Sequence, residues 1–84
     1  MDALDRNPAL AKLLVRLKRV KNGNFGDHRS VGDGVVELRI DFGPGYRIYL
    51  GQDGDRVILL CGGTKRSQEE DIKTAKKYWK DYHA

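Results

Sequence analysis

The feature that most constrains this chain is a series of short alternating segments separated by glycine-rich turns. Residues 35–42 place apolar side chains at every even position and, after Val35, charged side chains at every odd one, which is the pattern of a half-buried strand. A Gly-Pro-Gly turn leads to a second alternating segment at 46–50, and a turn at 51–55 leads to a largely apolar segment at 56–61. Because short turns join neighbouring antiparallel strands, the sequence predicts a three-stranded antiparallel meander.

An amphipathic helix is predicted on each side of the meander. Residues 8–21 repeat apolar side chains at helical spacing, with Asn7 as the N-cap and a proline at the first helical position. After a Gly-Gly-Thr break in the sheet at 62–64, Ser67 opens a second helix through a Ser-Gln-Glu-Glu capping box. Eighty-four residues suffice for one small domain. The predicted fold is therefore α+β, a single domain over residues 1–84 with an N-terminal helix, the meander and a C-terminal helix.

Composition excludes several classes of protein. The longest apolar run, at 57–61, is far shorter than the roughly 20 residues that span a bilayer. The first twelve residues include Asp2 and Asp5, so we expect no signal peptide. The single cysteine, Cys61, cannot form an internal disulfide, and two histidines with one cysteine are too few for a zinc site. We therefore expect a cytoplasmic protein with no membrane segment, no metal and no cofactor.

Positive charge is concentrated near the N-terminus. The chain carries 16 Lys and Arg against 12 Asp and Glu, for a net charge of +4, and residues 12–29 hold six of these cations against one aspartate, or +5. Such a cluster favours a polyanion, either nucleic acid or an acidic protein, although a solvated surface is the alternative reading. The residues on this segment predicted to bind the nucleic acid or the acidic protein are Lys12, Arg16, Arg19 and Lys21.

Two arginines are the best candidates for chemistry. Arg39 and Arg47 occupy polar positions on neighbouring predicted strands, so their guanidinium groups can converge on one phosphate. Cross-strand pairing with Glu37 or Asp41 is the alternative interpretation, and it explains the same residues without any function. Tyr46 or Tyr49, together with Lys65, can border the same surface, and the C-terminal Tyr82 and His83 offer groups that transfer protons.

Four stretches of the sequence are characteristic of one family. They are Asn-Phe-Gly-Asp at 24–27, the segment at 31–49 that contains Glu-Leu-Arg-Ile and Gly-Pro-Gly-Tyr-Arg, the segment at 59–68 that contains Leu-Cys-Gly-Gly-Thr-Lys, and Asp-Ile at 71–72. Over residues 4–79 the chain resembles the RelE/ParE toxin superfamily. The branch that it resembles most is the HigB-type group of addiction module killer proteins.

The resemblance implies the toxin of a type II toxin–antitoxin system, with a cognate antitoxin of the helix-turn-helix type. RelE-like members cut mRNA on the ribosome, whereas ParE-like members inhibit DNA gyrase without cutting RNA. In the first case a ribose 2′-OH attacks the adjacent phosphate, two arginines stabilise the transition state, a lysine or tyrosine assists proton transfer, and a C-terminal tyrosine or histidine acts as the acid. By motif position these residues are Arg39, Arg47, Lys65, Tyr46, Tyr82 and His83.

The chain departs from the family at its start. Family members usually begin with a strand and a longer first helix, whereas Met1 falls within the region that matches that helix. We expect the missing strand to leave a sheet edge unfilled unless a partner covers it. The leading hypothesis is a ribosome-dependent mRNA endonuclease. The alternatives are a ParE-like gyrase inhibitor and an inactive, shortened form that binds the antitoxin.

Overall fold

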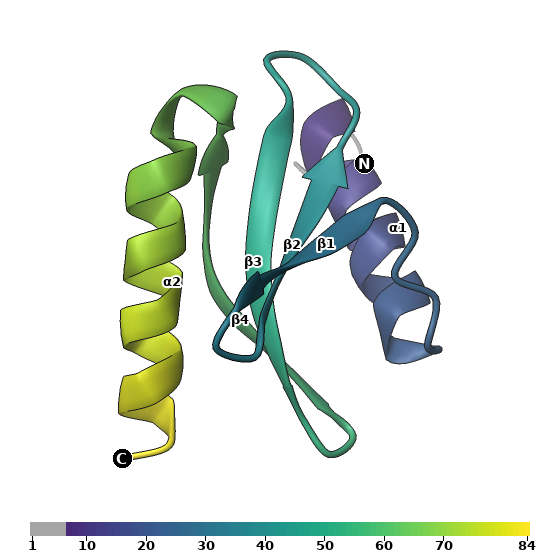
Figure 1. Cartoon of the computed structure of the whole chain (residues 1–84). Coiled ribbons are helices and arrows are strands. Elements are labelled where there is room, and N and C mark those ends of the chain that lie inside the picture. Colours follow the sequence, from purple (N-terminus) through teal and green to yellow (C-terminus); the bar gives the residue numbers. More distant parts are fainter. Residues whose placement is uncertain (1–6) are drawn as a thin grey trace.

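The computed structural model describes residues 7–84, which form three layers. Two helices lie on opposite faces of one antiparallel sheet (Figure 1), whose strands follow the order β1-β2-β3-β4. The predicted α+β class, with a helix before the sheet and a helix after it, is confirmed. In chain order the elements are α1 (Pro8–Lys21), β1 (His28–Gly32), β2 (Val35–Ile40), β3 (Tyr46–Asp53), β4 (Arg56–Thr64), the 3₁₀ turn η1 (Lys65–Ser67) and α2 (Gln68–Tyr82).

The prediction of three strands is wrong, because β1 adds a fourth at the edge of the sheet. Its side chains are mostly exposed and lack apolar alternation, so the strand is held largely by backbone pairing with β2. Asp33 and Gly34 make the turn between them with φ angles of 58° and 83°. An Asp-Gly pair with two positive φ angles forms a hairpin turn whose twist matches that of the flanking strands. This dipeptide was the sequence signal that would have predicted β1.

The strand β4 is also longer than predicted. Gly62 and Gly63 were expected to break the sheet, yet the strand continues through them to Thr64. A Cβ on Gly63 would overlap the Asp71 carboxylate and the Ser67 hydroxyl, so this glycine allows the first turn of α2 to lie against the strand. The hydroxyl of Ser67 bonds the backbone of Thr64 rather than capping α2, so the predicted Ser67 capping box is wrong.

Each face of the sheet has its own small core. On the α2 side, Tyr49 packs with Ala75 and Trp79, and on the α1 side Leu38 and Leu50 pack with Val20. The predicted N-cap of α1 is confirmed, since the Asn7 side chain accepts a hydrogen bond from the Leu10 amide at 3.1 Å. No helix within residues 7–84 is both long and apolar enough to cross a membrane. The predicted absence of a signal peptide rests on Asp2 and Asp5, which lie outside the described residues.

Arg16 fastens α1 to the sheet. Its guanidinium donates hydrogen bonds to the backbone carbonyls of Phe25 and Asp27, both at 2.9 Å, and to the carbonyl of Arg39 on β2. These three acceptors lie in the loop after α1 and in the strand beneath it. Three of the guanidinium donors of Arg16 are therefore used within the fold, and its binding to RNA or an antitoxin stays a prediction.

Replacing Gly51 by alanine tests the packing of α2. A Cβ at this buried position would lie 2.6 Å from the ring of Trp79, so either the helix or the indole has to move. Overpacking of this kind costs about 1–3 kcal/mol of unfolding free energy, which urea denaturation measures. The exposed neighbour provides the control, since Gln52→Ala should change stability by less than about 0.5 kcal/mol. Equal stability of both variants would contradict the tight packing.

Replacing Arg16 by leucine tests the attachment of α1. The change removes all three hydrogen bonds to backbone carbonyls, and hydrogen bonds from charged groups contribute roughly 1.5–3 kcal/mol. We therefore expect Arg16→Leu to unfold at a lower urea concentration, with a loss of about 2 kcal/mol of unfolding free energy. The exposed Lys18 on the same helix provides the control, because Lys18→Leu removes the same charge without a backbone contact. If Arg16→Leu and Lys18→Leu lose the same unfolding free energy, the hydrogen bonds of Arg16 do not hold α1 on the sheet.

Candidate anion-binding site

The α2-side face of the sheet carries a cluster of charged residues that the strand register brings together. Arg29 of β1 pairs directly with Glu37 of β2, and Glu37 pairs with Tyr49 of β3. One step along the sheet, Arg39 pairs with Arg47. Directly paired residues point their side chains to the same face. Three guanidinium groups and one carboxylate therefore share a small area of the sheet.

Glu37 is the centre of this cluster. Its side chain is fully buried, with 0% exposure. One oxygen, Oε1, accepts a hydrogen bond from Arg29 Nε at 2.9 Å, and the other, Oε2, accepts from the Tyr49 hydroxyl and the Gln68 amide, both at 2.9 Å. Gln68 is the first residue of α2, so the same carboxylate also joins the helix to the sheet.

These contacts fix the protonation of both buried groups. Burial alone would raise the pKa of Glu37, but the hydrogen bonds from Arg29, Gln68 and Tyr49 outweigh it, so the pKa lies below its ordinary value. Burial, followed by the hydrogen bond to Glu37, raises the pKa of Tyr49 far above its ordinary value. At neutral pH Glu37 is therefore ionised and Tyr49 is protonated. Neither group is suited to proton transfer.

Arg39 and Arg47 are held beside Glu37 without being neutralised by it. Their Nε atoms lie 3.6 and 3.7 Å from the carboxylate oxygens, and within residues 7–84 both Nε atoms are buried with no hydrogen-bond partner. Arg39 and Arg47 thus pair with Glu37, as the alternative interpretation predicted. The second acidic neighbour of Arg39 is Asp27 rather than Asp41, with Asp27 Oδ1 3.9 Å from Arg39 Nη1. With Asp27 counted, three guanidinium groups against two carboxylates leave this cluster at +1.

The two arginines differ in accessibility. The Arg39 side chain is 43% exposed, whereas that of Arg47 is only 13% exposed. Polar positions on alternating strands predict that both side chains face solvent, which is correct for Arg39 and wrong for Arg47, whose side chain is mostly buried. Like charges directly opposite on neighbouring strands destabilise a sheet. An arrangement of this kind suits an anion that bridges them.

Other predicted site residues lie at varying distances from the cluster. Lys65 is exposed at the start of η1, two positions after the residue that pairs with Arg47, so it lies at the same end of the sheet. Tyr46 pairs with Ile40 and Thr64 and by strand alternation points to the α1 side. Tyr46 is therefore separated from the arginines, and Tyr49 takes its place among them.

Tyr82 and His83 lie at the far end of α2. The helix has 15 residues, so these side chains are roughly 20 Å along its axis from Gln68, which contacts Glu37. The Tyr82 hydroxyl donates to Asp53 Oδ2 at 2.8 Å, and its ring stacks on Trp79. His83 packs edge-on against Trp79, with Nδ1 2.8 Å from the Trp79 carbonyl oxygen. The structure does not bring them into one site with the arginines.

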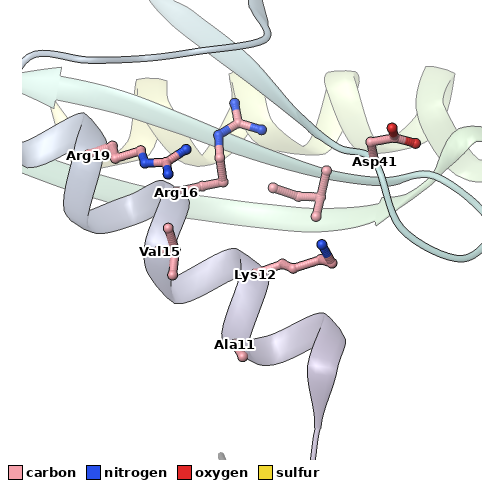
Figure 2. Close-up of a pocket in the computed structure, with 7 residues that line it drawn as sticks. Ala11, Lys12, Val15, Arg16, Arg19 and Asp41 are labelled. Carbon is pink, nitrogen blue, oxygen red and sulfur yellow. The ribbon is translucent and has the colours of Figure 1, made fainter.

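The remaining predicted binding residues are on α1, across the sheet from the cluster. Lys12 lies 5.8 Å above the ring of Phe42, Arg16 is bound to backbone carbonyls, and Lys21 is exposed in the last turn. A groove of about 410 Å³ lies along this helix, lined by Ala11, Lys12, Val15, Arg16, Arg19, Ile40 and Asp41. Figure 2 shows the side chains that α1 contributes to it. The basic segment is therefore a second, separate surface.

Two members of the cluster were missed by sequence reasoning. Arg29 was counted only as a positive charge, because β1 was not recognised, and the Asp-Gly turn after it was the signal that would have placed it. Gln68 had no signal of its own, since its contact with Glu37 spans 31 residues of sequence. Within residues 7–84 no three His, Cys, Asp or Glu side chains are grouped closely enough to hold a metal ion.

Comparison with known proteins gives one close relative. The chain is 61% identical over 69 residues to an uncharacterized protein of Haemophilus influenzae Rd, which covers 81% of this chain and 70% of that protein. The chain belongs to the same family as this Haemophilus protein. No family model matches the chain, and no solved structure matches it.

Neutralising Glu37 tests the cluster. Because the pKa of Glu37 is lowered by folding, its ionised form stabilises the protein above the unfolded-state pKa of about 4.3, and this contribution is lost as pH falls through the lower folded-state pKa. Glu37→Gln should therefore lose roughly 3 kcal/mol at pH 7, since it leaves three arginines without their carboxylate. The difference in unfolding free energy between Glu37→Gln and the unsubstituted protein should become smaller as the pH falls below about 4.

Urea unfolding between neutral and strongly acidic pH measures this effect. The exposed Glu69 of α2 provides the matched control, because it makes no ion pair within residues 7–84, and Glu69→Gln should change little at any pH. If the loss of unfolding free energy in Glu37→Gln stayed constant across the pH range, the Glu37 side chain would stabilise the fold through its packing rather than through its charge.

Proposed function

We propose that this protein is the toxin of a type II toxin–antitoxin system, a cytoplasmic endonuclease that cuts mRNA on the ribosome. The sequence resemblance to the RelE/ParE superfamily supports the class. The observation that carries the activity is the directly opposed pair Arg39 and Arg47, two guanidinium groups that share one buried carboxylate. Such a pair matches the charge that develops on a phosphate under attack.

The proposed reaction is transesterification within the RNA chain. The ribose 2′-oxygen forms a bond to the adjacent phosphorus, and the bond from phosphorus to the 5′-oxygen of the next nucleotide breaks. One proton leaves the 2′-hydroxyl and one proton reaches the departing 5′-oxygen, which yields a 2′,3′-cyclic phosphate and a 5′-hydroxyl. The guanidinium groups of Arg39 and Arg47 stabilise the two negative charges on the non-bridging oxygens.

Proton transfer is the weaker part of this site. Glu37 and Tyr49 are engaged with each other at 2.9 Å, and Tyr82 and His83 lie at the far end of α2, so we assign proton transfer to Lys65 and to the ribosomal environment. Much of the acceleration then comes from the ribosome orienting the 2′-hydroxyl in line with the leaving oxygen. Because the ribosome supplies part of the catalysis, we expect little cleavage of RNA that is not bound to a ribosome.

The same observation favours a second candidate. A cationic face without a free acid–base pair is also suited to binding without cleavage, as expected for a ParE-like inhibitor of DNA gyrase. The two candidates differ in their cellular effect. Cleavage stops translation and creates new 5′ ends inside open reading frames, whereas gyrase inhibition induces the DNA-damage response and leaves messages intact.

Induced expression with mapping of mRNA 5′ ends tests the proposal. Arg39→Ala should stay folded, since the side chain is partly exposed and its Nε makes no hydrogen bond. It should reduce cleavage by roughly a hundredfold or more, the usual effect of removing one preorganised charge. Arg39→Lys should recover only part of the activity, because an ammonium cannot form the bidentate contact.

Arg56 at the start of β4 provides the matched control. It is an exposed arginine at the other end of the sheet, where it pairs with Asp53, so Arg56→Ala should cleave mRNA normally. Intact messages together with an induced DNA-damage response would replace the nuclease with the gyrase inhibitor. Full cleavage by Arg39→Ala would move the active surface elsewhere.

A further inference from the structure

Two uncharged donors occupy one oxygen of the buried Glu37 carboxylate. A carboxylate oxygen offers about two lone-pair positions, and at Oε2 the Tyr49 hydroxyl and the Gln68 amide donate to it, each at 2.9 Å. A guanidinium would bind the same oxygen more strongly, because hydrogen bonds between two charged groups are stronger than those from a neutral donor. The neutral donors nevertheless hold both positions.

Arg47 is the guanidinium that these donors keep away from Oε2. Its Nε atom lies 3.7 Å from that oxygen, beyond hydrogen-bond distance, and is buried without a partner within residues 7–84. Within the same residues its side chain donates one hydrogen bond, from Nη1 to the Gly45 carbonyl at 3.4 Å. The charge of Arg47 is therefore not neutralised by a direct hydrogen bond.

Arg39 is in a different position. Its guanidinium lies between two carboxylates, with Nε 3.6 Å from Glu37 and Nη1 3.9 Å from Asp27. In the part of the chain that the structure describes, Glu37 is the one carboxylate that pairs with Arg47. The state of Arg47 therefore depends on which groups occupy Glu37 Oε2.

We propose that Gln68 and Tyr49 are positioning residues of the anion site, which keep Arg47 available for an external phosphate by saturating Glu37 Oε2. Loss of either donor frees one lone-pair position on this oxygen. Arg47 Nε then needs to move by only about 1 Å to donate a charged hydrogen bond to it. A guanidinium bound to Glu37 in this way has less charge and fewer donors to offer a phosphate.

The location of Gln68 links the anion site to α2. Gln68 is the first residue of this helix, and its contact with Glu37 spans 31 residues of sequence. The packing of the first turn of α2 on the sheet therefore sets how strongly the arginine pair binds an anion. The inference rests on the proposed function only for the source of the anion, which would be the phosphate of an RNA chain.

Phosphate titration of the ¹⁵N-labelled full chain tests the inference. The probe is inorganic phosphate, with sodium chloride at equal ionic strength as the reference, and the readout is the NMR resonance of each arginine Nε–H group. Gln68→Leu keeps a similar shape but removes the donor, so the phosphate dissociation constant should rise roughly tenfold. The Arg47 Nε–H resonance of this variant should already be shifted before phosphate is added. Tyr49→Phe should act in the same direction.

Gln52→Leu provides the matched control. It makes the same chemical change at an exposed position of β3, where the side chain contacts the Gly54 carbonyl and not Glu37. Because Gln52 shares no partner with the arginine pair, phosphate affinity should stay within about twofold of the unsubstituted protein.

A second substitution separates positioning from a purely structural role. Adding Glu37→Gln to Gln68→Leu removes the carboxylate that captures Arg47, so phosphate affinity should return at least to that of the unsubstituted protein. If Gln68 only stabilised the fold, the second change would weaken binding further. The two single variants, Gln68→Leu and Tyr49→Phe, decide the question if the double variant does not fold.

Two results would overturn the inference. One is a folded Gln68→Leu protein that binds phosphate as tightly as the unsubstituted protein, and the other is an equal loss of affinity in Gln52→Leu. Failure of the proposed function looks different, because it leaves mRNA intact in cells while the phosphate affinities follow the pattern above. Cleavage of mRNA together with unchanged phosphate binding by Gln68→Leu would instead reject the positioning role alone.

Discussion

The buried carboxylate of Glu37 is the interaction on which the rest of the structure depends. It joins three strands and the first residue of α2, through Arg29, Tyr49 and Gln68, each at 2.9 Å. A buried charge is costly unless it is paired and hydrogen-bonded, and here both oxygens are satisfied. The same carboxylate allows Arg39 and Arg47 to stand directly opposite each other on neighbouring strands. Without it, the repulsion of these guanidinium groups would oppose the register of β2 and β3.

The sheet separates two surfaces with different physical character. On the α2 side, paired arginines surround a fixed carboxylate, which suits an anion with several oxygens. On the α1 side, a groove that contains the exposed Val15 carries the cations Lys12 and Arg19 along the helix. A protein of this size has few faces to use, and two helices covering opposite faces leave one charged surface on each side.

The local elements were largely predictable, and the reasons are local. The helix at 8–21 was predicted with the bounds that the structure shows, because its apolar spacing, its Asn7 cap and its proline all act within one or two turns. The strands β2 and β3 follow from alternation and from the turns between them. The edge strand β1 was missed because it buries almost nothing, so it has no apolar pattern to detect. The end of β4 was misjudged because glycines usually mark turns, whereas here Gly62 lies against Ile48 of β3 and Gly63 admits the close approach of Ser67 and Asp71.

The sequence by itself determined the class of fold, the order of its main elements, the neighbouring positions of Arg39 and Arg47, and the excess of positive charge near the N-terminus. These follow from periodicity and composition, which act over a few residues. Only the tertiary structure decided that Glu37 is buried among arginines, that Arg16 is a structural anchor, and that Tyr82 and His83 lie away from the arginine pair. The physical reason is that each depends on contacts between segments distant in sequence. Which donors meet which acceptors there is set by the packing of helices on the sheet, not by residue type.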